Sequence, residues 1–322
     1  MNNKIGILTV FFGKCPNFIH LFINSCKTQS NIDFIFFTDW DWRNIDLPNN
    51  IIRYQTNLKE FNKLATVKTG IDINVEFGYK LCDMKPAWTH IYEDYLKEYK
   101  FVGYCDIDLV FGNIRKFFTN DIEDSVDLFT ITTTYLSGAL TIIKNDAKMR
   151  TLYKEAKGWD YIFKDPRHFA FDEYLRIHPS DKDVESYSDL VFSKEKEGAI
   201  KVEHSEYIGY EKRPYNKVYY NNGIVLAEGK EYIFFHYVVA KQYAFWVVPD
   251  WIQIPNSYYV NKYGFYKDGN RAIRLYDLFF KQFYRKQLQI NLRRKINTLK
   301  KIIQKLEFRR LWAAFIKQMG LE

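Results

Sequence analysis

Two aspartates with one residue between them follow a short apolar run and suggest a cation site. Residues 101–105 are mostly apolar, and Asp106 and Asp108 come directly after them. Side chains at positions i and i+2 of an extended segment point to the same side of the chain. Two carboxylates placed in this way can hold one divalent cation, because hard cations take oxygen ligands.

The same triplet occurs twice more in the chain, so its surroundings have to distinguish the three copies. Asp39 and Asp41 also follow an apolar run, but a tryptophan lies between them and no glycine follows. That pair is therefore the weaker candidate for a cation site, and a place at the surface is one interpretation of it. Asp181 and Asp183 lie in a polar stretch behind a proline, which indicates a solvated loop.

The elements that must position these residues are predicted from hydrophobic spacing. Residues 5–12, 34–38 and 51–54 are rich in Ile, Val and Phe, which is typical of buried strands. Between the first two runs, residues 16–27 carry apolar side chains at helical spacing. Strand, helix and strand in this order predict a parallel β-α-β unit within an α/β fold.

The rest of the pattern predicts further helices and strands. Helices are expected at residues 58–69, 86–99, 146–156 and 171–177, and strands at 101–105, 127–132, 139–143 and 230–239. Residues 178–200 are polar and acidic, which predicts a surface loop.

Composition indicates a folded protein of the cytoplasm. Of the 322 residues, 47% are hydrophobic, which is enough for a sizeable core and excludes general disorder. The four cysteines have no C-x-x-C spacing, as is typical of reduced thiols. We expect the first residues to form a strand rather than a signal peptide. The sequence contains no run of 18 apolar residues, so we expect no membrane span.

The net charge of +8 is concentrated in the last part of the chain. Residues 281–319 contain twelve Lys and Arg and one acid, Glu307, a sum of +11. Apolar residues recur there at steps of three and four and predict a basic amphipathic helix: Leu288, Leu292, Ile296, Leu299, Ile303 and Leu306. Such a helix can bind an anionic membrane surface, pack on its own domain or on a second subunit in a homodimer, or bind nucleic acid. We expect this helix to bind the membrane surface and not nucleic acid. We also expect the chain to consist of one domain at residues 1–270 and a tail at residues 271–322.

Four ordered patterns carry a resemblance to a known class of enzymes. They are the segment 79–86 that opens a helix, Asp106-Ile107-Asp108 with Gly112 behind it, the turn Ser137-Gly138-Ala139, and a late group made of Asp172-Glu173 and His236 with Lys241. The set resembles GT-A-type nucleotide-sugar glycosyltransferases over residues 4–245. It is most similar to family 8-like enzymes and to transferases encoded in bacterial surface-polysaccharide loci. This implies a GT-A (Rossmann-like) fold, in which a mixed, mostly parallel sheet is flanked by helices.

The chain departs from those relatives at three places. They commonly have Asp-Gln at the position of Asp172-Glu173, Asn at the position of Ser137, and Pro-Trp after the late lysine, where this chain has Gln242-Tyr243. These differences bear on the identity of the acceptor and on the stereochemistry of the transfer. They leave the expected metal ligands unchanged.

The resemblance implies a metal site whose chemistry suits sugar transfer. Asp106, Asp108 and His236 are the expected ligands, and Lys241 is expected on the leaving phosphate. A divalent cation would stabilise the charge of the leaving diphosphate. Imidazole suits Mn²⁺ better than Mg²⁺, so Mn²⁺ is the expected cofactor and Mg²⁺ the alternative.

Asp172 or Glu173, at the start of a predicted helix, is the expected catalytic group near the anomeric carbon. An inverting enzyme would use it as a general base, whereas a retaining enzyme would use it to stabilise the sugar cation or to orient the acceptor. The resemblance favours retention of configuration.

The donor is expected at the carboxyl ends of the first strands. Thr9, Phe11 and Phe12 would flank the base and ribose, Asp39 would accept a hydrogen bond from them, and Lys85 would reach the phosphates. The expected donor contacts also include Asp106, Ser137, Gly138 and Lys241.

The predicted function is metal-dependent transfer of a hexose from a nucleotide diphosphate sugar, expected to be a UDP-sugar. The expected acceptor is a surface glycan on a lipid carrier, of the capsule, O-antigen or LPS type, at the inner face of the cell membrane. Two alternatives remain open. One is a metal-dependent phosphodiester or pyrophosphate hydrolase, which also uses paired carboxylates and histidine. The other is a nucleic-acid-binding protein that uses the basic tail.

Overall fold

The protein divides into two compact units, Met1–Lys267 and Asp268–Glu322. Its structure, a computed structural model, describes residues 4–43, 45–180, 182–205, 208–211, 218–242, 246–251, 253–261 and 264–267. The predicted amphipathic helix of the tail lies outside these residues and stays a prediction. In the part that is described, no helix is long and apolar enough to cross a membrane.

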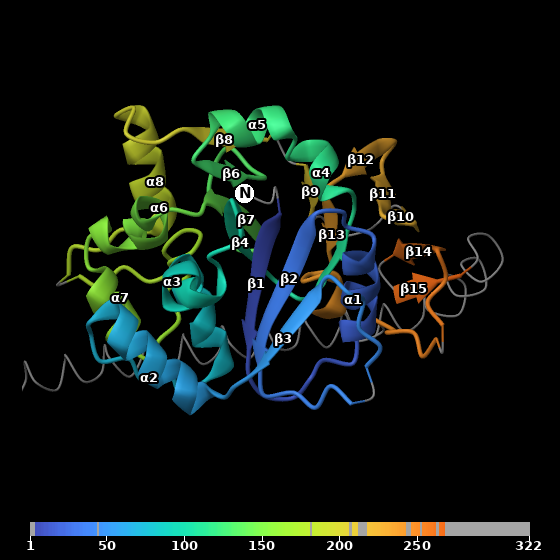
Figure 1. The fold of residues 1–322 in the computed structure, drawn as a ribbon, viewed down its shortest axis with the longest axis horizontal. Coiled ribbons are helices and arrows are strands. Elements are labelled where there is room, and N and C mark those ends of the chain that lie inside the picture. Colours follow the sequence, from blue (N-terminus) through green and yellow to red (C-terminus); the bar gives the residue numbers. More distant parts are fainter. Residues whose placement is uncertain are drawn as a thin grey trace, which may run out of the picture. The chain divides into compact units, whose positions relative to one another are not determined.

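A mixed sheet of seven strands forms the centre of the first unit, in the order β3-β2-β1-β4-β7-β6-β8 (Figure 1). Its strands are β1 Ile5–Phe11, β2 Ile32–Thr38, β3 Ile51–Gln55, β4 Phe101–Cys105, β6 Leu128–Thr130, β7 Leu140–Lys144 and β8 Val202–His204. The first four run parallel to one another, and β7 is antiparallel to both β4 and β6. The strands predicted at residues 5–12, 34–38, 51–54, 101–105, 127–132 and 139–143, the parallel β-α-β unit and the α/β class with a mostly parallel sheet are confirmed.

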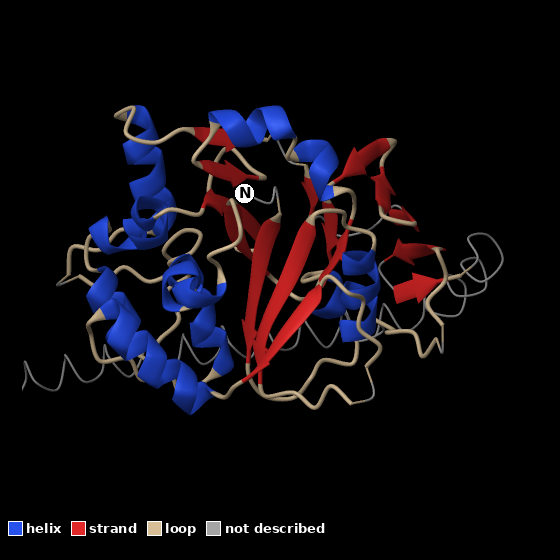
Figure 2. Cartoon of the chain, in the orientation of Figure 1, coloured by secondary structure: helices blue, strands red, loops and turns tan. Residues whose placement is uncertain are grey.

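Helices lie on both sides of this sheet, as Figure 2 shows. They are α1 Ile19–Lys27, α2 Leu58–Thr69, α3 Lys85–Ile91, α4 Ile114–Phe117, α5 Asn120–Ser125, α6 Ala147–Thr151, α7 Trp159–Lys164 and α8 Tyr187–Lys196. Short 3₁₀ helices are η1 Gly78–Met84, η2 Glu93–Tyr95, η3 Leu152–Glu155 and η4 Ala240–Gln242. Local signals set several ends: the Asn57 side chain caps α2 at its start, and Gly70 ends it with φ 79°.

The two faces of the sheet belong to two separate cores. Alternate residues of β1 point to opposite faces, so that Leu8 and Val10 lie in one core and Ile5 and Ile7 in the other. The first core includes Phe61 of α2 and residues of α3, and the second includes residues of α1. Burial on both faces explains why these strands read as continuous apolar runs.

Two smaller sheets lie beside the central one. One has the order β5-β13-β9, with β5 Leu109–Phe111, β13 Phe234–His236 and β9 Gly209–Tyr210. The other has the order β12-β11-β10-β14-β15, with β10 Val218–Asn221, β11 Ile224–Ala227, β12 Lys230–Tyr232, β14 Ser257–Asn261 and β15 Gly264–Tyr266. The prediction of one strand at residues 230–239 was therefore wrong, because the chain changes sheets at Ile233.

Three local predictions differ from the structure. The helix expected at 86–99 ends at Ile91 and is followed by the separate turn η2. The loop expected at 178–200 contains α8, which begins with a capping box formed by Ser186 and Asp189. The helix expected at 171–177 does not form, because Ala170 takes the left-handed conformation at φ 59° and the amides beside it bind a buried carboxylate.

Candidate active site

Strand pairing brings Asp108 and His236 together across 128 residues of sequence. Asp106 directly follows β4, and Asp108 directly precedes β5. The strand β5 pairs antiparallel with β13, and Leu109 lies opposite His236 in this register. The amide of Tyr237 donates to the carbonyl of Asp108 at 3.1 Å. The sheet β5-β13-β9 therefore fixes the histidine beside the Asp-x-Asp triplet.

Gly112 makes this close pairing possible. A Cβ atom at this position would lie 2.2 Å from the carbonyl oxygen of Tyr232, which belongs to the backbone and cannot move aside cheaply. The amide of Gly112 donates to the carbonyl of Ile233 at 2.8 Å. The glycine behind the triplet is thus needed for the approach of the strand that carries His236.

Three potential metal ligands converge at one point. His236 Nε2 lies 3.4 Å from Asp108 Oδ1 and 3.9 Å from Asp106 Oδ2. One ligand atom from each residue lies within 4.8 Å of the other two. His236 Nε2 is buried and makes no hydrogen bond. A buried nitrogen without a partner, facing two carboxylates, fits a divalent cation that takes imidazole and carboxylate ligands.

Each of the three ligands is held through its other polar atom. Lys85 Nζ donates to Asp106 Oδ1 at 2.8 Å, and Lys241 Nζ donates to Asp108 Oδ2 at 2.6 Å. Glu211 Oε1 lies 3.0 Å from His236 Nδ1. The free atoms are thereby aimed at their common point, as outer partners do in known metal sites.

Glu211 was not predicted from the sequence. It follows β9 directly, and the parallel pairing of Tyr210 with Phe235 places it beside His236. No motif surrounds it, because its role depends on a strand pair and not on neighbouring residues.

The charges at this point reinforce one another. Burial by itself lowers the pKa of His236, but the carboxylate of Asp108 outweighs it and raises the pKa to about 10. Burial opposes ionisation of Asp108, yet His236 and Lys241 hold its pKa well below the usual range. Burial also disfavours the Lys85 ammonium, but the carboxylate of Asp106 contributes to a pKa well above the usual value. Without a cation, the histidine and the aspartate form a buried ion pair.

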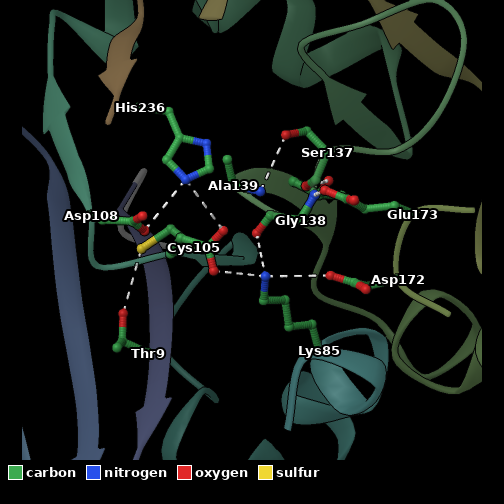
Figure 3. Close-up of polar contacts among 12 residues, drawn as sticks. Thr9, Lys85, Cys105, Asp108, Ser137, Gly138, Ala139, Asp172, Glu173 and His236 are labelled. Carbon is green, nitrogen blue, oxygen red and sulfur yellow. Dashed lines mark hydrogen bonds and ion pairs between the residues drawn. The ribbon is translucent and has the colours of Figure 1, made fainter. Parts of the chain in front are cut away.

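A second carboxylate pair faces these potential metal ligands from a turn at residues 169–173, here called the acid turn. Asp172 Oδ2 lies 3.3 Å from Lys85 Nζ, and Glu173 Oε1 accepts a hydrogen bond from the amide of Gly138 at 3.2 Å (Figure 3). A Cβ atom on Gly138 would lie 2.5 Å from Asp172 Oδ2 and 2.9 Å from Lys85 Nζ. A side chain at this position of the turn from β6 to β7 would therefore displace the carboxylate of Asp172 or the ammonium of Lys85.

Burial changes the ionisation of both acids in this turn. It raises the pKa of Asp172 to about 7, although the ammonium of Lys85 acts in the opposite direction. Burial also raises the pKa of Glu173, again against Lys85. The site thus combines Asp108, which its cationic neighbours keep ionised, with two acids whose pKa is raised by burial, a separation typical of catalytic acid and base groups.

A cavity of about 610 Å³ joins these groups. The predicted site residues that line it are Thr9, Phe11, Lys85, Asp106, Asp108, Asp172, Glu173, His236 and Lys241. Its size and mixed lining suit a ligand of nucleotide-sugar dimensions.

The other predicted donor residues lie elsewhere. Phe12 packs in the core against Phe61. Asp39 does not line the cavity, and its carboxylate accepts hydrogen bonds from the amide of Gly13 at 2.9 and 3.1 Å. Ser137 is fully buried and accepts from the amide of Ala139 at 3.2 Å (Figure 3), so its hydroxyl serves the turn.

Asp83, His168 and Asp172 also cluster closely enough to be tested as a second metal site. Both oxygens of Asp83 are already occupied, since Oδ1 accepts from the amides of Phe169 and Phe171 and Oδ2 from Lys80. A carboxylate with these partners has little capacity left for a cation, so the donor set does not fit a second metal.

Comparisons with known proteins complete this description. No curated protein matches the chain. Among solved structures it is similar to galactosyltransferase LgtC in complex with donor and acceptor sugar analogues, at 13% identity and a TM-score of 0.35, over 65% of this chain and 75% of that chain. It is also similar to the apo form of mouse xyloside xylosyltransferase 1, at 9% identity and a TM-score of 0.35, over 65% of this chain and 88% of that chain. Likenesses this distant carry no argument, and the candidate site rests on its own geometry. The model of one protein family, described as a family of unknown function (DUF6625), matches residues 7–265, and the chain belongs to this family.

Proposed function

We propose that this protein is a metal-dependent GT-A glycosyltransferase that moves a hexose from a nucleotide diphosphate sugar, with UDP-sugars as the first donors to test. One observation carries the proposal. Asp106, Asp108 and His236 each turn one atom toward a common point, while Lys85, Lys241 and Glu211 hold their other polar atoms. A cation bound to a diphosphate would take its protein ligands from such an arrangement.

A bound Mn²⁺ or Mg²⁺ would supply positive charge that stabilises the leaving diphosphate. The protein's own cations add to it. Lys241 Nζ lies beside Asp108 in the cavity and would meet a phosphate oxygen there, and Lys85 Nζ links Asp106 to the acid turn. Thr9 and Phe11 line the part of the cavity at the end of β1, where base and ribose would bind.

Asp172 and Glu173 are the groups proposed to act at the sugar. Both line the cavity, and Lys85 connects them to the metal ligands through Asp172. In a retaining reaction, which we favour, one ionised carboxylate would stabilise the positive charge on the anomeric carbon and the other would orient the acceptor hydroxyl.

The proposed acceptor and the proposed location in the cell rest on the sequence. The basic stretch 281–319, with its sum of +11, suits peripheral binding at the inner face of the cell membrane. A glycan on a lipid carrier would then be the acceptor. Sedimentation of the full chain with anionic vesicles, but not with neutral ones, is the expected result, and equal binding to both would contradict it.

The main test is transfer of labelled sugar. The full chain is incubated with UDP-glucose, UDP-galactose or other UDP-sugars, Mn²⁺, and lipid-linked glycans from a bacterial membrane extract. We expect label in a glycan, dependence on Mn²⁺, and loss of transfer on chelation. Metal-dependent release of phosphate without transfer to any acceptor would instead support a hydrolase and overturn the proposal.

A further inference from the structure

A buried ion pair lies beneath the acid turn and takes no part in the chemistry proposed so far. Lys80 and Asp83 belong to η1, and their side chains are 1% and 0% exposed. Lys80 Nζ lies 2.9 Å from Asp83 Oδ2. Burying two charges is costly unless they gain close partners, so the partners of this pair indicate what it does.

Asp83 binds the backbone of the acid turn. Its carboxylate accepts hydrogen bonds from the amide of Phe169 at 3.1 and 3.0 Å and from the amide of Phe171 at 3.0 Å. Between these amides, Ala170 has φ 59°, a left-handed conformation that residues with a side chain rarely adopt. Two amides on one carboxylate can stabilise that conformation, because they would lose their acceptor if the turn straightened.

Lys80 fixes the chain that leads into the turn. Its ammonium donates to the carbonyl of Ile162 in α7 at 2.6 Å, to the carbonyl of Arg167 at 2.9 Å, and to Asp83 at 2.9 Å. These three bonds use all three hydrogens of the ammonium group. The segment from α7 to the acid turn is thus held at both ends by one buried pair.

The turn in its held form directs its two acids into the cavity. The amide of Glu173 donates to the carbonyl of Ala170 at 3.1 Å, so the left-handed residue sets where Glu173 begins. Asp172 reaches Lys85, which lies only two residues after Asp83. The six residues from Lys80 to Lys85 therefore hold the turn through its backbone and also through one of its carboxylates.

We propose that the Lys80–Asp83 pair is a positioning device that sets Asp172 and Glu173 for sugar transfer. This inference rests on the proposed function. The metal ligands come from other elements, the end of β4 and β13, so the pair governs the sugar-facing acids and leaves the metal point unchanged.

The test replaces both charges together, because exchanging one alone would leave a buried charge that can unfold the protein. In the double variant Lys80→Met, Asp83→Leu, we expect transfer kcat to fall about 10- to 100-fold, since small displacements of reacting groups have effects of this size. Affinity for UDP with Mn²⁺ is expected to stay within threefold. The amides of Phe169 and Phe171 are expected to exchange hydrogen faster than in the unchanged protein.

A matched control is the ion pair of Arg115 and Glu123, whose side chains are 14% and 1% exposed on α4 and α5. The variant Arg115→Met, Glu123→Leu should change thermal stability and leave kcat as it was. The proposal is overturned if the folded Lys80, Asp83 variant keeps its kcat, if its amides exchange as before, or if UDP affinity falls as much as kcat. If the unchanged protein transfers no sugar, the proposed function fails, and amide exchange still decides whether the pair holds the turn.

Discussion

Two Asp-x-Asp triplets leave the same edge of the central sheet, one on each side of β1. Asp39 follows β2, and Asp106 follows β4, and both strands run parallel to β1. In sequence the two triplets differ only in their middle residue, and both follow apolar runs. In the structure they have different surroundings and different partners.

In the first triplet, Asp39 accepts hydrogen bonds from the amide of Gly13, and only Asp41 has its partner close by in sequence. Asp41 pairs with Arg43 two residues away, and these side chains are 55% and 86% exposed. The second triplet is partnered by distant elements, since Lys85 lies 21 residues before Asp106 and Lys241 lies 133 residues after Asp108. A carboxylate pair becomes a candidate site when the fold brings it lysines from distant elements and a histidine with a free nitrogen. A carboxylate that is exposed to solvent and paired with a near neighbour in sequence is a surface feature.

Substitution of a ligand in the second triplet is expected to have the largest effect. Asp108→Asn keeps the size of the side chain but removes the charge that faces His236 and Lys241. We expect transfer turnover to fall about 1,000-fold, corresponding to roughly 4 kcal/mol of lost transition-state stabilisation. Affinity for UDP with Mn²⁺, measured by calorimetry, should become too weak to detect.

Circular dichroism and thermal melting of Asp108→Asn serve as the folding control for that experiment. A folded variant that keeps near-normal turnover in chelated buffer would remove the basis for separating the two triplets.

The dependence of metal affinity on pH tests the same contrast without substitution. His236 has a pKa raised to about 10 in the metal-free protein, so it is protonated below that pH and must lose its proton to bind a cation. Affinity for Mn²⁺ should therefore rise with pH, by about tenfold per unit and about 100-fold from pH 7 to 9. Calorimetry in buffers of different ionisation enthalpy should show release of about one proton per cation.

A pH-independent affinity would mean that His236 is not a ligand. The variant His236→Asn is the control, because it should bind Mn²⁺ more weakly and release no proton.

Glu211→Gln is expected to have an intermediate effect. Glutamine can still accept a hydrogen bond from His236 Nδ1 but lacks the charge that orients and polarises the ring. We expect about a tenfold loss of Mn²⁺ affinity, with turnover restored by excess Mn²⁺. Unchanged affinity would show that Glu211 only fills space at the edge of the cavity, whereas turnover that stays low at saturating Mn²⁺ would assign it a direct part in the chemistry.

The elements that could be predicted from the sequence are those whose burial leaves a pattern in neighbouring residues. The strands β1, β2 and β4 are continuous apolar runs because both of their faces are covered, and the carboxylates at the end of β4 follow from that pattern. Glu211 could not be predicted, because only the register of β9 on β13 places it at His236.

The acid turn shows the opposite case, in which a distant partner overrides a local pattern. Its residues were predicted as a helix, but the carboxylate of Asp83, 86 and 88 residues away, binds the amides of Phe169 and Phe171. A partner outside its own segment also binds Asp39, whose carboxylate accepts hydrogen bonds from the amide of Gly13 on the neighbouring loop, and its nucleoside contact stays a prediction. Residue types made these acids candidates, whereas their partners could be identified only from the fold.

Substitution in the first triplet is expected to have the smallest effect and is the matched control for the second. Asp41→Asn removes an exposed carboxylate whose only recorded partner, among the described residues, is Arg43. Exposed ion pairs of this kind contribute little, because water solvates both charges well. Turnover and affinity for UDP with Mn²⁺ should each stay within about twofold of the unchanged protein. If Asp41→Asn instead weakened Mn²⁺ binding as strongly as Asp108→Asn does, exposure and local pairing would not be what separates the two triplets, and a cation would have to bind on both sides of β1.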